Sequence, residues 1–236
     1  MTGSPAQRFV WLLPAAVSVV LFWPGLQCWF QQDDFAWLAL GQGIESAPDL
    51  LRALFQPMAQ GTIRPISERA FFMGFFAVFG LDALPFRIGV FLTYLVDLWL
   101  VYRIGLRLTA SAGAAALAVL LWGVNSALGM PLAWTSSYNQ ILCAACLLGA
   151  LELWMRFADT GRKGCLWGCW IVFLLGFGVL ELNVVFPALA FSYALLYAPH
   201  VWRYTLPMFA VSGLYAVVHR MAAPRVRSGP YAMHVD

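Results

Sequence analysis

Long apolar stretches, separated by short polar breaks, run through most of the chain. Residues 9–32 carry no charged side chain, and residues 108–151 form a second uncharged run. A helix needs about 20 apolar residues to cross a bilayer, so the second run is long enough for two crossings with a turn between them. The pattern predicts an all-α, polytopic membrane protein with about seven transmembrane helices, near residues 9–29, 86–106, 110–128, 139–157, 165–181, 183–199 and 204–221.

Residues 30–85 are expected to form a long outer loop that contains interfacial helices. Ser46-Ala47-Pro48-Asp49 is typical of a helix start and precedes a short amphipathic segment. Residues 70–81 are apolar but would make only about 18 Å of helix, which is too short to cross. We expect an interfacial or re-entrant helix there, capped by Ser67 and ended by Gly80.

The distribution of Lys and Arg predicts the orientation of these spans. With seven crossings and a cytoplasmic N-terminus, the inner loops carry several basic residues and the short outer loops near 130–138 and 181–183 carry none. This arrangement obeys the positive-inside rule. The sequence therefore predicts an integral multi-pass protein of the plasma (inner) membrane whose active face is extracytoplasmic.

Composition narrows the classes of function. The chain is 62% hydrophobic and 11% charged, with a mean hydropathy of +0.76, which excludes a soluble globular enzyme and a disordered chain. The net charge of +3 comes without a Lys/Arg run, so no nucleic-acid partner is expected. The five cysteines lie mostly in apolar stretches, where packing between helices is their expected role.

Polar chemistry concentrates just after the first predicted span. Asp33 and Asp34 are adjacent carboxylates at the membrane surface, which suits a general base or a cation ligand. A solvated helix cap before Phe35 is an equally good interpretation of the pair. Further along the loop, Arg64 offers a planar fork for phosphate, whereas Glu68 and Arg69 are expected to pair or to reach lipid headgroups.

This order of features resembles the GT-C glycosyltransferases, and within them the protein O-mannosyltransferase and aminoarabinose transferase-like group. The matching features are an acidic pair after the first span, Arg64-Pro65 before an aromatic segment that ends in Phe79-Gly80, and a span that closes on Tyr102-Arg103. Asn125 and Trp134 flank the second outer loop, and Glu181 precedes an apolar span containing Pro187. Members of this group generally have more spans and a second large outer loop, so the chain resembles an N-terminal portion truncated after residue 236.

The resemblance implies an inverting transfer of sugar from a polyprenyl-phosphate donor in the membrane to a hydroxyl of a protein, glycan or lipid acceptor. It places the catalytic carboxylate at Asp33 or Asp34 and does not choose between them. Arg64, Arg225 and Arg227 would contact the phosphate, and Glu181 could line the donor pocket. A divalent cation held by the acidic pair is left open.

Two intramembrane or near-membrane carboxylates support other interpretations. Asp97 lies within a predicted span and is expected to hydrogen-bond Asn125, Tyr94 or Ser126. Together with Glu181 it could form the ion path of a transporter or channel portion. The third alternative is a non-catalytic membrane scaffold.

Overall fold

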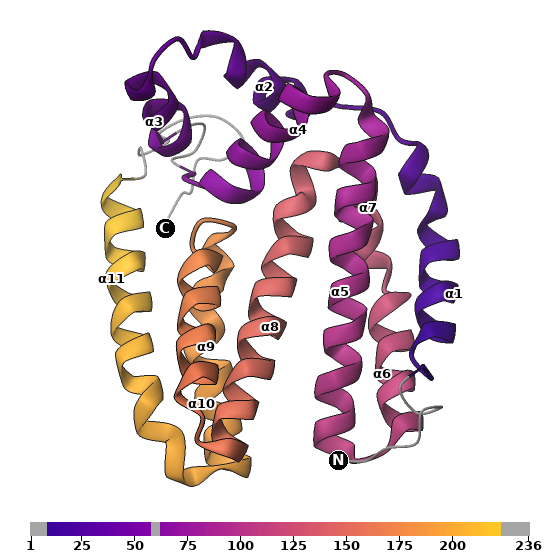
Figure 1. The fold of residues 1–236 in the computed structure, drawn as a ribbon, viewed down its shortest axis with the longest axis vertical. Helices are drawn as coiled ribbons and strands as arrows, with labels where there is room; N and C mark the ends of the chain where they lie inside the picture. The colour runs from indigo at the N-terminus through magenta and orange to yellow at the C-terminus, as the bar shows by residue number, and fades with distance from the viewer. Residues whose placement is uncertain (1–8, 58–61, 223–236) are drawn as a thin grey trace, which may run out of the picture.

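The computed structural model describes residues 9–57 and 62–222, and within these ranges the secondary structure is entirely helical (Figure 1). The predicted all-α class is therefore confirmed. The α-helices are α1 (Leu12–Phe22), α2 (Asp34–Ala39), α3 (Ala47–Phe55), α4 (Phe71–Phe79), α5 (Ala83–Thr109), α6 (Ala112–Gly123), α7 (Gly129–Ala133), α8 (Tyr138–Thr160), α9 (Lys163–Gly176), α10 (Phe186–Tyr197) and α11 (Leu206–Ala222). Short 3-10 and π-helical segments join them, of which η2 (Trp23–Gln27), η5 (Pro65–Ala70), η7 (Thr135–Ser137), η8 (Glu181–Val185) and η9 (Pro199–Thr205) matter below.

The longer helices run along the long axis of the molecule, and the short helices α2, α3 and α4 cover one end of them (Figure 1). We call this end the loop end; it comprises residues 28–57 and 62–82 and the turns 124–137 and 177–185. At the opposite end α5 connects to α6, α8 to α9, and α10 to α11 (Figure 1). We call it the basic end, because Arg103, Arg107, Arg156, Arg162, Lys163 and Arg203 lie there.

Two apolar clusters hold the long helices together, and α8 contributes to both. One cluster packs α1, α5, α6 and α8 around the fully buried Leu98 and Val119. The other packs α8 to α11 around Trp154 and Phe186. Helix α6 approaches α1 so closely that a Cβ on Gly123 would lie 2.3 Å from the Ser18 hydroxyl, the small-residue packing that membrane helices favour.

Two helical segments of the described chain are long and apolar enough to cross a membrane. They are Ala83–Thr109 and Thr135–Thr160, and the pair Ala112–Gly123 and Ser126–Ala133, bent by 53°, makes a third if it counts as one span. Shorter apolar helices occupy Leu12–Gln27, Lys163–Gly176 and Glu181–Tyr197. Six of the predicted spans coincide with these segments, and the seventh, near 204–221, coincides with α11, which is not among them. That all seven cross a membrane stays a prediction.

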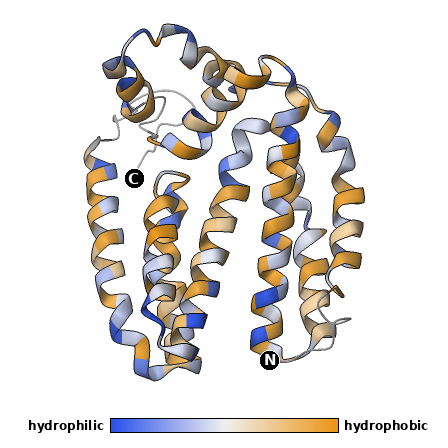
Figure 2. Cartoon of the chain, in the orientation of Figure 1, coloured by the Kyte–Doolittle hydropathy of each residue, from blue (hydrophilic) through white to orange (hydrophobic). Residues whose placement is uncertain are grey.

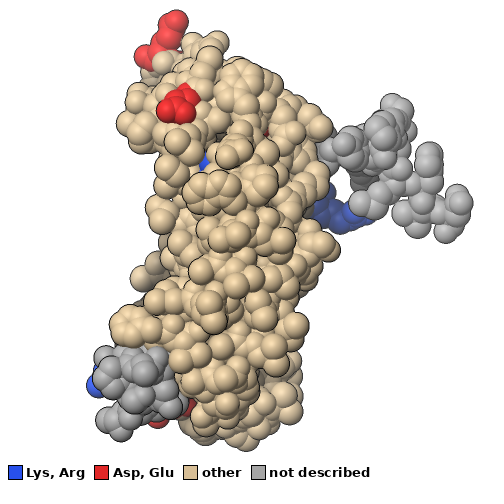
Figure 3. Space-filling view, turned by 90° about the vertical axis from the view of Figure 1, so that its right-hand side faces the viewer, with Lys and Arg blue, Asp and Glu red and all other residues tan. Residues whose placement is uncertain are grey.

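The sides of the bundle expose large apolar side chains. Leu13 and Leu196 are each 75% exposed and Met221 is 81% exposed. Hydrophilic positions lie mainly toward the two ends of the long helices (Figure 2), and charged side chains on the face of Figure 3 gather toward the ends and leave a broad uncharged band. Exposed apolar surface of this extent is typical of a protein that contacts lipid or a partner.

The loop end matches part of the expectation. Helix α3 begins after Ser46, whose hydroxyl accepts from the Asp49 backbone N–H at 3.4 Å, and α4 ends at Gly80 with φ +58°. The predicted cap at Ser67 is wrong: this residue lies inside η5, and its hydroxyl donates to the Val179 carbonyl at 2.7 Å. The turn in the second uncharged run also comes early, because α6 ends at Gly123 and the Asn125 side chain caps the next turn.

Candidate functional site

A cavity of about 610 Å³ lies at the loop end, between residues 33–68 and the start of α8. Its lining combines polar side chains with an apolar surface. The polar contributors include Asp33, Thr62, Arg64, Glu68, Asn139 and Gln140, and the apolar ones include Leu128, Pro131, Ile141, Leu147, Leu180 and Leu182. A ligand with a polar head and a hydrocarbon tail fits such a lining.

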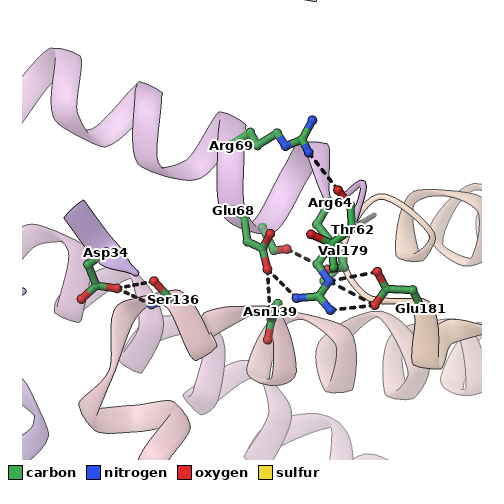
Figure 4. Close-up of polar contacts among 10 residues, drawn as sticks. Asp34, Thr62, Arg64, Glu68, Arg69, Ser136, Asn139, Val179 and Glu181 are labelled. Atoms are coloured by element: carbon green, nitrogen blue, oxygen red, sulfur yellow. Dashed lines mark hydrogen bonds and ion pairs between the residues drawn. The ribbon is translucent and has the colours of Figure 1, made fainter. Parts of the chain in front are cut away.

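The structure gives the two adjacent aspartates different surroundings. Asp34 is fully buried, and its Oδ1 accepts from the Ser136 N–H at 2.7 Å and from the Ser136 hydroxyl at 2.5 Å (Figure 4). Its Oδ2 accepts from the Gln31 N–H at 3.0 Å, so both oxygens are occupied. Asp33 is exposed and lines the cavity. Asp34 therefore holds the loop in place, whereas Asp33 is the exposed member of the pair and lies at the cavity.

The segment that carries Asp33 is held against the turn between α7 and α8. Gln31 Nε2 donates to the Ala133 carbonyl at 3.2 Å, and the Trp134 indole N–H donates back to the Gln31 carbonyl at 3.3 Å. With the Asp34–Ser136 bonds, these contacts join residues about a hundred positions apart in sequence. They fix the position of the Asp33 backbone relative to α7 and α8.

Arg64 forms the polar centre of the cavity's other side. Its Nε donates to both oxygens of Glu181 at 3.1 and 3.0 Å, and Nη2 donates to Oε2 at 2.9 Å (Figure 4). Nη1 donates to Glu68 Oε1 at 2.5 Å. One guanidinium thus joins two carboxylates, and the three side chains together carry one negative charge.

Glu68 also connects this centre to α8. Its Oε1 accepts from Asn139 Nδ2 at 2.9 Å, while Oε2 is buried without a partner among the described residues. The Glu68 side chain is only 4% exposed. A buried carboxylate oxygen without a donor is costly, so this side chain is held in place by Arg64 and Asn139 through Oε1 alone.

Arg64 stays protonated in this arrangement. Burial by itself lowers the pKa of the guanidinium, but the hydrogen bonds to Glu181 and the charge of Glu68 outweigh it, so the pKa is raised above its ordinary value. A guanidinium has five N–H donors, and the bonds to Glu181 and Glu68 use three. Two N–H groups are left for an anionic ligand.

Backbone contacts place Arg64 at the cavity. The π-helical segment η5 follows it directly, and the Ile66 N–H donates to the Gly178 carbonyl at 2.9 Å. Arg69, fully buried, donates to the Thr62 carbonyl at 2.9 Å (Figure 4) and to the Leu54 carbonyl at 2.6 Å. Burial lowers the pKa of Arg69, and its role is to hold the end of α3 against η5, not to reach lipid headgroups as expected.

Two of the remaining predicted residues, Asn125 and Asp97, are not part of the cavity lining. Asn125 caps a turn by accepting from the Ala127 N–H at 3.0 Å. Asp97 is fully buried in α5, and neither carboxylate oxygen has a partner among the described residues, so its expected bonds to Asn125, Tyr94 or Ser126 are wrong. The Tyr94 hydroxyl instead donates to the Gly123 carbonyl at 2.6 Å. Arg225 and Arg227 lie outside the described residues.

The sequence leaves open a divalent cation at the acidic pair, and the structure describes the groups that could hold one. Within residues 9–57 and 62–222 no group of three or more His, Cys, Asp or Glu side chains is placed to hold a metal ion. Both oxygens of Asp34 are already bonded, so the acidic pair does not offer two free carboxylates. A cation at this site would have Asp33 as its protein ligand and would need further oxygens from the substrate.

Comparisons with protein-family models, curated proteins and solved structures find no match to this chain. The resemblance to GT-C glycosyltransferases accordingly rests on the residues quoted from the sequence.

Two residues of the site were not among the sequence-predicted ones. Ser136 binds Asp34, and Asn139 binds Glu68 (Figure 4). Both belong to the polar cluster between residues 135 and 140, which stands out within an otherwise apolar run. That contrast was the available signal, although it indicated a turn as readily as a binding site.

Proposed function

We propose that this chain is a multi-pass membrane protein that transfers a sugar from a polyprenyl-phosphate donor to an acceptor hydroxyl at its loop end. The observation that carries the proposal is the cavity, because Asp33 and Arg64 line it together with a mainly apolar surface. Transfer from a lipid-linked donor needs all three: an apolar path for the prenyl chain, a cation near the phosphate, and a base near the acceptor hydroxyl.

The proposed orientation puts the loop end on the extracytoplasmic side of the plasma (inner) membrane. Lys or Arg lies in or within a turn of each of the three connections at the opposite end, as Arg107, Lys163 and Arg203 do. An excess of basic residues on one side is the usual mark of the cytoplasmic side. Seven crossings are consistent with helices that alternate in direction between the two ends (Figure 1).

The reaction follows from the two charged groups. The acceptor oxygen attacks the anomeric carbon while its proton passes to the Asp33 carboxylate. The bond between that carbon and the phosphate oxygen breaks, and the electron pair stays on the departing polyprenyl phosphate. The two free N–H groups of Arg64 would stabilise that charge, and attack opposite the leaving group inverts the anomeric configuration.

The negative charge around the cavity opposes binding of the donor's phosphate. Arg64 with Glu68 and Glu181 is net negative, and Asp33 adds a further negative charge. A phosphate would therefore bind better with a divalent cation that Asp33 and the phosphate share. Removal of divalent cations with a chelator tests this dependence directly.

Asp33→Asn is the decisive variant. We expect sugar transfer in proteoliposomes with labelled polyprenyl-phosphate sugars to fall about 10²- to 10⁴-fold, the usual contribution of a general base. Glu45→Gln, an exposed acid of the same loop, is the matched control and should leave transfer unchanged. Wild-type rates in the Asp33 variant would rule out the assigned base.

A binding measurement separates recognition from turnover. Arg64→Lys keeps the charge but loses the planar fork, so it should weaken retention of labelled polyprenyl phosphate. Equal retention by wild type and variant would exclude Arg64 as the phosphate contact. The orientation is tested by single cysteines at Glu45 and Thr160 in a cysteine-free background, where an impermeant reagent outside the cell should label only the first.

A transporter or channel portion is less well supported by the geometry. Asp97 is buried within α5 and does not line the cavity, while Glu181 is committed to Arg64 at the loop end. The two carboxylates therefore do not form one polar path in this structure. An ion flux in proteoliposomes that Asp97→Asn abolishes would reverse this preference, and a scaffold would show neither flux nor transfer.

A further inference from the structure

A second charged centre lies at the basic end, on the faces of α5 and α8 that meet there. Glu152 is 3% exposed, and its Oε1 accepts from Arg103 Nη2 at 3.0 Å and from Arg156 Nε at 2.9 Å. Arg107 Nη2 lies 3.5 Å from the same oxygen and pairs through Nη1 with Asp159. Three guanidinium groups thus share two carboxylates, which leaves the cluster with one positive charge in excess.

The arginines keep most of their hydrogen-bonding capacity. Among the described residues Arg103 and Arg156 each use one of five N–H donors, and their side chains are 35% and 38% exposed. A guanidinium with free N–H donors binds phosphate oxygens well. The buried carboxylate between them holds both in position before any ligand arrives.

The position of Trp99 shows how the cluster meets its surroundings. This residue lies one helical turn before Arg103 on α5, is 37% exposed, and its ring centre is 5.5 Å from the Arg103 guanidinium carbon. Tryptophan prefers the headgroup layer of a bilayer. At the same end, Arg203 lies over the ring of Trp202 at 5.6 Å.

We propose that Arg103 and Arg156 form a binding site for a phosphate-bearing anion, with the headgroup of an anionic phospholipid as its source. The proposal needs the membrane orientation given above but not the transferase activity. Basic sites between helices on the cytoplasmic side are suited to anionic headgroups. The apolar flank of α5, including Leu92 and Val96, is exposed beside the cluster and would contact the acyl chains.

The test measures lipid retained by purified full-length protein from mixed vesicles of phosphatidylglycerol and phosphatidylcholine, using native mass spectrometry. Wild type should retain phosphatidylglycerol in preference. The double variant Arg103→Gln, Arg156→Gln should bind it roughly ten- to thirtyfold more weakly, as expected for two charges removed at a membrane surface. Arg52→Gln removes an exposed arginine at the loop end and should change nothing.

Further arms keep the outcome clear. Arg103→Lys, Arg156→Lys keeps the charge, should fold, and should retain the preference in weakened form. If wild type binds inorganic phosphate but does not prefer phosphatidylglycerol, the anion site is supported and is assigned to a soluble phosphate. If wild type retains the two lipids equally and binds no inorganic phosphate, the proposal is overturned, whether or not sugar transfer is found.

Discussion

Each end of the molecule holds a cluster of arginine–carboxylate ion pairs, and the two clusters have net charges of opposite sign. At the loop end one arginine, Arg64, serves two carboxylates, while at the basic end the buried carboxylate of Glu152 serves three arginines. At the loop end the residue shared by several partners is a cation, and at the basic end it is an anion. Each cluster should therefore depend on its single shared residue and tolerate the loss of one of the others.

The largest effect is expected from Arg64→Gln. This change leaves the buried Glu68 and the partly buried Glu181 facing each other without a cation, and orphaned buried charges cost about 3 kcal/mol. Titration with a denaturing detergent should show that loss in the free energy of unfolding. Arg52→Gln is the matched control because its side chain is 68% exposed, and a loss no larger than in this control would refute the shared-cation interpretation.

Glu152→Gln should come second. Loss of the Glu152 charge leaves Arg103, Arg107 and Arg156 with Asp159 as their nearby carboxylate. The arginines are partly exposed, so water can solvate them. We expect a loss of about 2 kcal/mol in the free energy of unfolding. Part of it should return when salt is raised, since screening weakens repulsion among exposed charges. A loss that salt does not alter would mean that repulsion is not its cause.

The smallest effect is expected from Arg103→Gln alone. Glu152 keeps Arg156 and Arg107 as partners, so the free energy of unfolding should fall by less than about 1 kcal/mol. The same titration, run beside Arg64→Gln, checks the contrast between the ends. If the two single arginine variants lose equal stability, the comparison drawn here is wrong.

Local sequence signals gave several elements of this structure correctly. The helical class followed from apolar run lengths, the start of α3 from Ser46, and the end of α4 from Gly80. These depend on contacts within a few residues, because caps and apolar faces are local properties. The inward position of Ser67 was missed because a partner distant in sequence, the Val179 carbonyl, decides it. The early end of α6 was missed although the cap that follows it, at Asn125, is local.

The sequence by itself determined that polar chemistry would follow the first apolar run, because residues 30–85 hold nine of the 25 charged residues of this apolar chain. Only the tertiary structure separated Asp34, bonded to Ser136, from Asp33, which faces the cavity. Only it paired Arg64 with Glu181 across 117 positions and gathered three arginines around Glu152. The reason is physical: a charge's role depends on which partners share its buried surroundings, and helix packing brings those partners together.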